Sequence, residues 1–283
     1  MKKILVTGAT GQLGKEISAF YSNRPDMELV LTDVDELDIT RIEAVTEYVD
    51  GIKPYAIINC AAYTAVDACE DNQDMAFKVN AIGPRNLAIA ASKTDSKIVH
   101  ISTDYIFDGK NKNKYTEFDI PNPCSVYGKS KLEGENFVKE FSKKYFIIRT
   151  AWLYGEGKNF VNTMLKLAET KKEISVVNDQ YGTPTSTKTV VEIIDLLLFT
   201  DNYGIYNGTC EGMCSWADFA EEIFRLAGKN TTVKRITSDE YPAKATRPEN
   251  SVLDNYMLRV VMNYTAPDWK QQIEKYIKDR MKK

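Results

Sequence analysis

The sequence predicts an α/β protein built on a doubly wound parallel sheet. Short β-branched runs alternate with longer amphipathic stretches over about the first 150 residues, as in successive strand–helix–strand units. The short runs are almost continuously apolar, which is typical of parallel strands covered by helices on both faces. With 43% hydrophobic and 27% charged residues among 283, the chain has an ordinary globular composition and can bury a sizeable core.

Five runs in the first half are the predicted strands, at residues 4–7, 28–32, 55–60, 97–102 and 145–150. Between them, Thr40 to Glu43 reads as a capping box that starts a helix, and Pro54 follows the end of that helix. Residues 75–92 and 125–144 form two longer helical patterns. This alternation predicts that the strands lie parallel in one doubly wound sheet.

The pattern changes after Trp152. Helical stretches alternate with turn-rich segments there: the stretches are 160–170, 187–199 and 216–227, and the turn-rich segments are 178–184 and 243–251. We expect a second, smaller region on the carboxyl edge of the sheet. Residues 104–123 form a long polar loop after the fourth strand, and such a loop in a compact domain is usually functional or mobile.

Charge and composition exclude several classes of function. Lys and Arg number 37 and Asp and Glu number 40, so the net charge is −3 and no broad nucleic-acid-binding surface is expected. No apolar run approaches the roughly 18 residues of a membrane span, and the N-terminus turns polar too soon for a signal peptide. We therefore expect a cytoplasmic protein without a membrane partner. His100 is the single histidine, so a His-based triad or a His-rich metal site would depend on that residue alone.

The cysteines indicate no disulfide framework and no zinc site. There are five, an odd number, and none forms a CxxC pair: Cys60, Cys69, Cys124, Cys210 and Cys214. Cys210 and Cys214 could supply two zinc ligands, but no second pair completes a tetrahedral site. We expect reduced thiols, as is usual for a cytosolic chain.

A glycine-rich turn lies directly between the first predicted strand and the first helix. Gly8, Gly11 and Gly14 give it a GxxGxxG spacing. Glycine allows a tight turn and close approach to a pyrophosphate, which then meets the free N–H groups at the start of the helix. We therefore expect residues 1–151 to form a dinucleotide-binding Rossmann domain, to which later segments can return. Residues 152–283 should form mainly a substrate-binding α/β region.

Asp33 ends the second predicted strand, 19 residues after Gly14. A carboxylate at this point can accept hydrogen bonds from the ribose hydroxyls of adenosine. The residues that follow, Val34 to Glu36, include no arginine to hold a 2′-phosphate. Taken alone, this favours NADH over NADPH; the alternative is an exposed turn aspartate.

Tyr127 and Lys131 form a YxxxK pair. Residues four apart lie on one face of a helix, and an ammonium near a phenol lowers the pKa of the phenol from about 10 toward working pH. A second pair, Tyr154 and Lys158, lies in a glycine-rich stretch that is a poor helix. Tyr127 opens the helix after the fourth strand. We expect the first and fourth strands to be neighbours at the switch point, so that the glycine loop and Tyr127 face one crevice.

Ser102 and Thr103 end the fourth predicted strand in that same crevice. A hydroxyl there can donate a hydrogen bond to a substrate carbonyl. The alternative is that both are simple turn residues at the end of a strand.

Together these motifs resemble the extended short-chain dehydrogenase/reductase superfamily. The resemblance covers most of the chain and includes the glycine loop, Asn59 to Ala62 after the third strand, Asn80, Ser102-Thr103 and the YxxxK pair. More narrowly, the chain is similar to the dTDP-4-dehydrorhamnose reductase family in six stretches that occur in the same order, at 61–67, 102–109, 149–154, 178–185, 247–251 and 267–269.

This resemblance implies reduction of the C4 keto group of dTDP-4-dehydro-L-rhamnose to dTDP-L-rhamnose by NADPH or NADH. It implies that Thr103 polarises the keto oxygen, that Tyr127 donates the proton, and that Lys131 tunes Tyr127 and holds the nicotinamide ribose. Besides Thr103, Asp104 and Trp152 match positions that contact the sugar. The positions that match cofactor contacts are Gly8, Gly11, Gln12, Leu13, Gly14, Asp33, Asp38, Ile39, Ala61, Ala62, Tyr63, Thr64, Asn80, Tyr127 and Lys131.

Two other functions stay open. One is a nucleotide-sugar epimerase or 4,6-dehydratase, although dehydratases carry Thr-Asp-Glu where Tyr105 follows Asp104 here. The other is a non-catalytic NADP-binding regulatory subunit, against which the presence of all three proposed catalytic residues argues. Some members of the family bridge a homodimer through magnesium, and Glu16 could match one ligand. Because no partner carboxylates are identified, we expect no metal, and a homodimer rests on the family alone.

Overall fold

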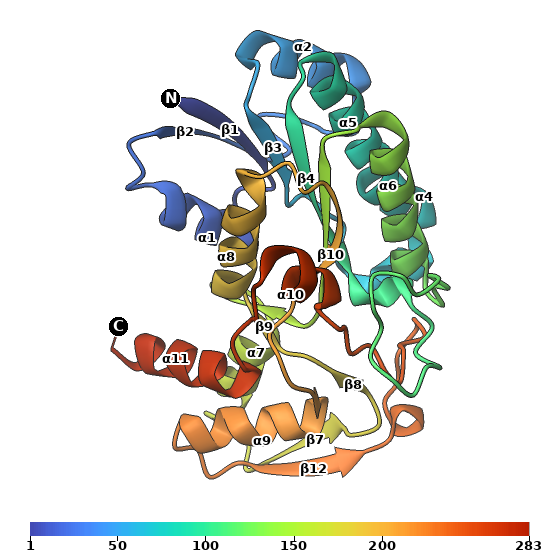
Figure 1. The fold of residues 1–283 in the computed structure, drawn as a ribbon. Coiled ribbons are helices and arrows are strands. Elements are labelled where there is room, and N and C mark those ends of the chain that lie inside the picture. Colours follow the sequence, from blue (N-terminus) through green and yellow to red (C-terminus); the bar gives the residue numbers. More distant parts are fainter. Residues whose placement is uncertain (283) are drawn as a thin grey trace.

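The computed structural model describes residues 1–282, and its centre is a six-stranded sheet in the order β10-β5-β4-β3-β1-β2 (Figure 1). Its strands are β1 (Lys2–Thr7), β2 (Met27–Thr32), β3 (Ala56–Asn59), β4 (Lys97–Thr103), β5 (Tyr145–Thr150) and β10 (Gly204–Asn207). Every pair of neighbours in this sheet runs parallel. The prediction of a doubly wound parallel sheet is confirmed, as are the five strands expected in the first half.

Helices cover both faces of the sheet (Figure 1). One face packs against α1 (Gln12–Tyr21) and α8 (Thr187–Leu198), and the other against α2 (Ile42–Ile52), α5 (Gly83–Lys93) and α6 (Val126–Phe141). Along β1, Ile4 and Val6 belong to the first core, whereas Leu5 belongs to the second. Successive residues of a strand point to opposite faces, so burial on both sides requires the continuous apolar runs seen in the sequence.

The expectation that the first and fourth strands are neighbours is wrong, because β3 lies between β1 and β4. The chain places β2 on one side of β1 and then crosses to the other side for β3. The switch point therefore lies between β1 and β3, where Thr7 pairs in register with Asn59. The end of β4 lies one strand further away.

Two details of the predicted helices also differ. The capping box at Thr40 is absent: α2 begins at Ile42 with Arg41 as its N-cap, and the Thr40 hydroxyl donates instead to Oδ1 of Asp38 (2.7 Å). The helical stretch at 75–92 comprises α4 (Gln73–Phe77), a π-helical segment (Lys78–Ile82) and α5. Just before it lies the short α3 (Val66–Asp71).

The second half of the chain contributes to two regions. The helices α7 (Phe160–Leu167), α9 (Trp216–Leu226) and α11 (Trp269–Met281) share a separate core below the main sheet (Figure 1). Three short strand pairs accompany them, namely β7 (Glu173–Val177) with β12 (Thr232–Ile236), β6 (Leu153–Tyr154) with β9 (Thr185–Ser186), and β8 (Tyr181–Gly182) with β11 (Cys214–Ser215). These strands were not predicted, because runs of two to five residues carry little periodicity. By contrast, α8 and β10 return to the main sheet.

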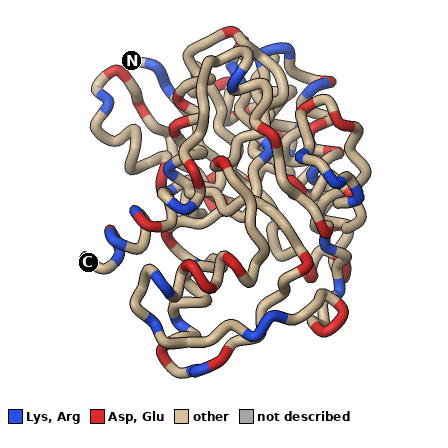
Figure 2. The backbone as a smooth tube through the Cα atoms, turned by 60° about the horizontal axis from the view of Figure 1, so that its bottom comes forward, with Lys and Arg blue, Asp and Glu red and all other residues tan. Residues whose placement is uncertain are grey.

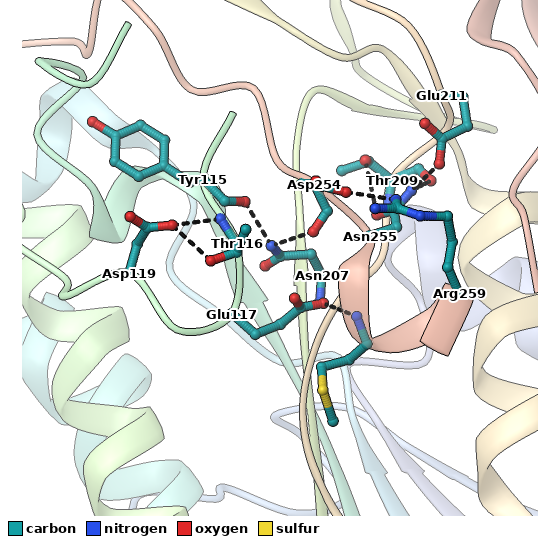
Figure 3. A network of polar contacts seen from close by, with 11 residues as sticks. Tyr115, Thr116, Glu117, Asp119, Asn207, Thr209, Glu211, Asp254, Asn255 and Arg259 are labelled. Atoms are coloured by element: carbon teal, nitrogen blue, oxygen red, sulfur yellow. Dashed lines mark hydrogen bonds and ion pairs between the residues drawn. The ribbon is translucent and has the colours of Figure 1, made fainter. Parts of the chain in front are cut away.

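The long loop after β4 is anchored at its base by a polar network (Figure 3). The amide of Tyr115 donates to the Val252 carbonyl (2.8 Å), and the side-chain amide of Asn207 donates to the Tyr115 carbonyl (2.9 Å). Oε1 of Glu117 accepts hydrogen bonds from the backbone of Asn207 (2.8 Å) and from the backbone of Met257 in α10 (Tyr256–Met262) (3.2 Å). The loop thereby joins the end of β10 to the C-terminal part of the chain.

Charged residues of both signs are interspersed along the backbone in the view of Figure 2. Within residues 1–282, no helix combines the length and the apolar character needed to cross a membrane. All five cysteines are free thiols.

Candidate functional site

Two adjoining cavities lie at the carboxyl ends of the main strands. The larger part of the predicted site lines a cavity of about 430 Å³, including Gly8, Gly11, Gln12, Leu13, Gly14, Ala62, Thr64, Thr103, Asp104, Tyr127, Lys131 and Trp152. The second, of about 450 Å³, shares Gly8, Gly11 and Ala62 with the first and adds Asp33, Asp38, Ile39, Ala61 and Tyr63. The glycine loop and Tyr127 therefore face one crevice, as expected, although β1 and β4 are not adjacent.

The glycine loop requires glycine for steric reasons at two positions. Gly8 has φ 66°, in the left-handed region, and a Cβ there would lie 2.7 Å from the Ala61 nitrogen. A Cβ on Gly14 would lie 2.5 Å from the Gly8 carbonyl oxygen. Gly11 is the N-cap of α1, and no side chain caps that helix. The first N–H groups of α1 thus remain available to an anion in the cavity.

Asp33 lies at the rim of the second cavity as a fixed anion. Its Oδ2 accepts hydrogen bonds from the Thr10 hydroxyl and from the Thr10 amide (3.1 Å), and its Oδ1 accepts from the Val34 amide (2.9 Å). Partial burial opposes ionisation, but these hydrogen bonds outweigh it and lower the pKa of Asp33. Among the described residues that line this cavity, none is Lys or Arg.

Asn80 lies beneath the cavities instead of lining either of them. It is fully buried in the π-helical segment, and its Oδ1 accepts from the Tyr63 amide (2.8 Å). Its Nδ2 donates to the Tyr63 carbonyl (3.1 Å) and to Oγ of Ser130 (3.1 Å). The Asn80 amide thus holds Tyr63, which lines the second cavity, and a direct contact of Asn80 with the cofactor stays a prediction.

Lys131 and Tyr127 project from the first two turns of α6, which Ser125 caps by accepting from the Gly128 amide (3.1 Å). Lys131 is only 2% exposed, and its Nζ donates to the carbonyl of Ile101 (2.6 Å). Burial lowers the pKa of Lys131 to about 8, so the side chain is charged at neutral pH and neutral at moderately alkaline pH.

The prediction that Lys131 lowers the pKa of Tyr127 is wrong. Burial raises the pKa of the phenol, and the nearby Asp104 raises it further, while the hydrogen bond with Thr103 only partly opposes them. The Lys131 ammonium bonds to a backbone carbonyl instead of to the phenol. Tyr127 is therefore fully protonated near neutral pH, which is the state that a proton donor needs.

The two hydroxyls at the end of β4 have different partners. Oγ1 of Thr103 donates to Oδ1 of Asp104 (3.0 Å) and accepts from the Tyr105 amide (3.2 Å). The Ser102 hydroxyl donates to Oε1 of Glu135 (2.5 Å). Both hydroxyl protons are therefore engaged within the protein. Asp104, the acceptor of Thr103, lines the cavity, whereas Glu135, the acceptor of Ser102, does not, so Thr103 is the better placed donor for a ligand. Asp104 is 2% exposed, and burial raises its pKa to about 6.

Two tryptophans form one wall of the cavity. Trp152 has φ 47° and stacks on Trp216, with ring centroids 3.5 Å apart and planes 8° from parallel. Gly182 backs directly onto the Trp152 indole, so that a Cβ there would overlap the ring. The sequence did not point to Trp216, because it lies far along the chain at the start of α9 and outside any motif. A stacked indole pair suits the apolar face of a sugar ring or a base.

The second YxxxK pair has a structural role. Tyr154 is buried in the core of the second region, where its ring contacts Phe219 and Tyr276, and Lys158 is exposed. Glu16 accepts a hydrogen bond from Thr187 (3.1 Å), and within residues 1–282 no three His, Cys, Asp or Glu side chains are grouped to hold a metal.

The chain is similar to known proteins over almost its whole length. The family model described as RmlD substrate binding domain matches residues 1–282. A dTDP-4-dehydrorhamnose reductase from Aggregatibacter actinomycetemcomitans is 40% identical, covering 97% of this chain and 98% of the relative. Crystal structures of dTDP-4-dehydrorhamnose reductases from Clostridium acetobutylicum (51% identity) and from Bacillus anthracis in complex with NADP (42% identity) both superimpose with a TM-score of 0.96. Each covers 99% of this chain and 100% of the solved one.

The chain is thus similar to dTDP-4-dehydrorhamnose reductases over almost its whole length. It also has the fold and the order of motifs that the sequence predicted. The family model spans residues 1–282, and a curated relative is 40% identical to this chain. Both indicate the same family. The chain belongs to the dTDP-4-dehydrorhamnose reductase family.

Proposed function

We propose that the protein reduces the C4 keto group of dTDP-4-dehydro-L-rhamnose to give dTDP-L-rhamnose, a precursor of cell-surface polysaccharide. The observation that carries this proposal is that Thr103, Tyr127 and Lys131 line the same cavity as the glycine loop. A hydride donor held by that loop and a keto sugar beside Tyr127 would then share one site. The dTDP-4-dehydrorhamnose reductase of Bacillus anthracis was solved in complex with NADP, which supports a nicotinamide cofactor.

In the reaction, hydride reaches C4 and the keto oxygen becomes negatively charged. Tyr127 gives its phenolic proton to this oxygen, and Thr103 donates a hydrogen bond to it, which requires the Thr103 hydroxyl to turn away from Asp104. Lys131 donates to the nicotinamide ribose and places its positive charge next to the phenolate that Tyr127 becomes. Asp104 accepts hydrogen bonds from sugar hydroxyls, while Trp152 and Trp216 pack against an apolar face of the ligand.

For the cofactor, we propose that the N-terminus of α1 binds the pyrophosphate and that Asp33 accepts hydrogen bonds from the adenosine ribose. Asp38, Ile39, Ala61, Ala62 and Tyr63 would enclose the adenosine, and Thr64 would lie toward the nicotinamide. Asp33 is a fixed anion, and among the described residues no Lys or Arg lines this cavity. Both features favour a ribose without a 2′-phosphate. We therefore propose that the protein uses NADH as well as NADPH. A cytoplasmic location stays a prediction of the sequence, and a homodimer stays one that rests on the family resemblance alone.

The test is to mix the purified protein with reduced cofactor and dTDP-4-dehydro-L-rhamnose and to follow the absorbance of the reduced nicotinamide. We expect stoichiometric loss of that absorbance and a single 4-hydroxy product, whose configuration at C4 is read by NMR. Interconversion of sugars without loss of absorbance would indicate an epimerase. Cofactor binding without any change of the sugar would indicate a regulatory subunit.

A further inference from the structure

A fully buried ion pair lies next to Lys131, one turn further along α6. Glu135 is completely buried and Arg149, on β5, is 2% exposed. Nε of Arg149 donates to Oε1 of Glu135 (3.0 Å), and its Nη2 donates to Oε2 (2.8 Å). The Ser102 hydroxyl completes the arrangement by donating to Oε1. Ser102 and Arg149 are register partners on the adjacent strands β4 and β5, so the sheet itself brings them together.

The position of the carboxylate follows the spacing of the active residues. Tyr127, Lys131 and Glu135 lie four residues apart, so their side chains share one face of α6. A buried ion pair is costly, and apolar residues of similar volume often stabilise a fold equally well. The presence of charges at this place is therefore better explained by what they do to the neighbouring ammonium than by stability.

Of the other ionisable groups near Lys131, Cys60, His100 and Tyr127 carry no charge near neutral pH, whereas Asp104 is ionised. Burial raises the pKa of the Cys60 thiol, after β3, to about 12, and burial holds the pKa of His100, on β4, well below its usual range. Tyr127 is a neutral phenol. Asp104 lines the same cavity, but its carboxylate bonds to Thr103. Glu135 is thus the charged group that acts directly on Lys131, and its attraction opposes the loss of charge that burial favours.

We propose that Glu135 is a positioning residue that keeps Lys131 positively charged in the cavity, and that Arg149 limits the strength of this effect. The inference rests on the proposed function where turnover is measured, but it also concerns cofactor binding alone. Lys131 in its charged form donates to the ribose and its charge attracts the anionic cofactor, so both activity and cofactor affinity should fall as pH rises and Lys131 loses its proton. The pH at the midpoint of that fall reports the pKa of Lys131.

The experiment measures this alkaline midpoint in variants that change one charge at a time. In Glu135→Gln, Lys131 faces the unpaired Arg149 cation, and the midpoint should move to lower pH by about one unit. In Arg149→Met, Lys131 faces an unpaired carboxylate, and the midpoint should move to higher pH. The double variant, which lacks both charges, should lie between wild type and Glu135→Gln. The matched control is Glu274→Gln, which breaks the exposed pair with Lys278 on α11 and should leave the midpoint unchanged.

Each variant is measured twice, by turnover with the keto sugar and by titration with reduced cofactor across the pH range. Shifts of the alkaline midpoint in opposite directions for the two single variants support the inference. A merely structural role would lower stability in both variants without moving the midpoint according to the charge that is removed. Coincident midpoints, or shifts in one direction, overturn it. If the single variants do not fold, the double variant decides, since a midpoint at or above that of wild type contradicts the inference. If no variant and not even the wild type turns over the keto sugar, but the cofactor titrations show the expected shifts of the midpoint, the proposed function is refuted and the inference about Glu135 stands.

Discussion

The Thr103 hydroxyl donates a hydrogen bond to Oδ1 of Asp104, 3.0 Å away, at the point where β4 ends. Before a ligand arrives, the proposed donor to the keto oxygen thus directs its hydroxyl proton at the adjacent carboxylate. Asp104 is buried, and its pKa is raised to about 6, so an ionised and desolvated carboxylate is maintained at neutral pH. Such a group costs stability, which is typical of functional sites.

Replacing Asp104 with Asn should therefore stabilise the protein at pH 7 while impairing turnover. Because the folded pKa of Asp104 is raised above its unfolded value near 3.8, its favourable contribution is complete below about pH 4 and is lost as pH rises through about 6. A shift of about two units corresponds to about 3 kcal/mol. The free energy of unfolding of Asp104→Asn, measured at pH 4 and at pH 7, should show a smaller decline than wild type. The exposed Asp35→Asn is the control, and an unchanged decline in Asp104→Asn would contradict the prediction.

Thr103→Val should lower the rate of hydride transfer by roughly 10²–10³, which is about 3–4 kcal/mol of barrier for one donor to a developing oxyanion. Valine keeps the β-branched shape, so cofactor affinity should stay nearly intact. Ser102→Ala should instead lower stability, because it removes the donor to Glu135, and should reduce the rate much less. Single-turnover kinetics of both variants with the same keto sugar separates the two hydroxyls. A large loss in Ser102→Ala with little change in Thr103→Val would assign the donor role to Ser102.

Tyr127→Phe removes the proposed acid and keeps the ring, and it should reduce turnover by roughly 10²–10⁴. Cofactor affinity, measured by titration, should change little. Tyr154→Phe is the matched control, because that ring lies in the core of the second region and removing its hydroxyl, for which the described residues offer no hydrogen-bond partner, should leave the rate nearly unchanged. Near-normal turnover in Tyr127→Phe would exclude the proposed mechanism.

Asp33→Ala should weaken NADH binding more than NADPH binding. The carboxylate favours ribose hydroxyls and repels a 2′-phosphate, so its removal costs the first cofactor hydrogen bonds and relieves the second of repulsion. Isothermal titration with both cofactors measures the ratio. Equal losses for the two cofactors would show that Asp33 does not lie at the ribose. The exposed neighbour Asp35→Ala should leave the ratio unchanged.

Five of the main-sheet strands and the residues that line the shared crevice were accessible from the sequence because each depends on local position. Gly8, Thr103 and Tyr127 each lie within a few residues of the end of a strand or the start of a helix. Parallel strands bring all such ends to one edge of the sheet, whichever strands are neighbours. This is why the shared crevice was predicted correctly even though the adjacency of β1 and β4 was wrong.

The features that the sequence did not reveal depend on contacts between distant segments. Trp216 lines the cavity because the packing of α9 brings it onto Trp152. The role proposed for Glu135 depends on its ion pair with Arg149 on β5. The pKa of Tyr127 was misjudged for the same reason, since its value depends on burial and not on the spacing to Lys131. Asn80 occupies the position expected for a cofactor contact, but the π-helical segment directs its amide to Tyr63.

The return of β10 and α8 to the main sheet has a consequence for how the chain can be synthesised and divided. Ile205 pairs with Ile147, and α8 covers a face to which the earlier strands β1 to β5 contribute most of the buried residues. During translation, β5 is an unpaired edge and that face stays open until about sixty further residues have left the ribosome. A fragment that stops at residue 151 would keep this open edge permanently. We expect it to aggregate when expressed alone, whereas a fragment that extends through residue 207 contains all six strands of the main sheet and covers β5 with β10.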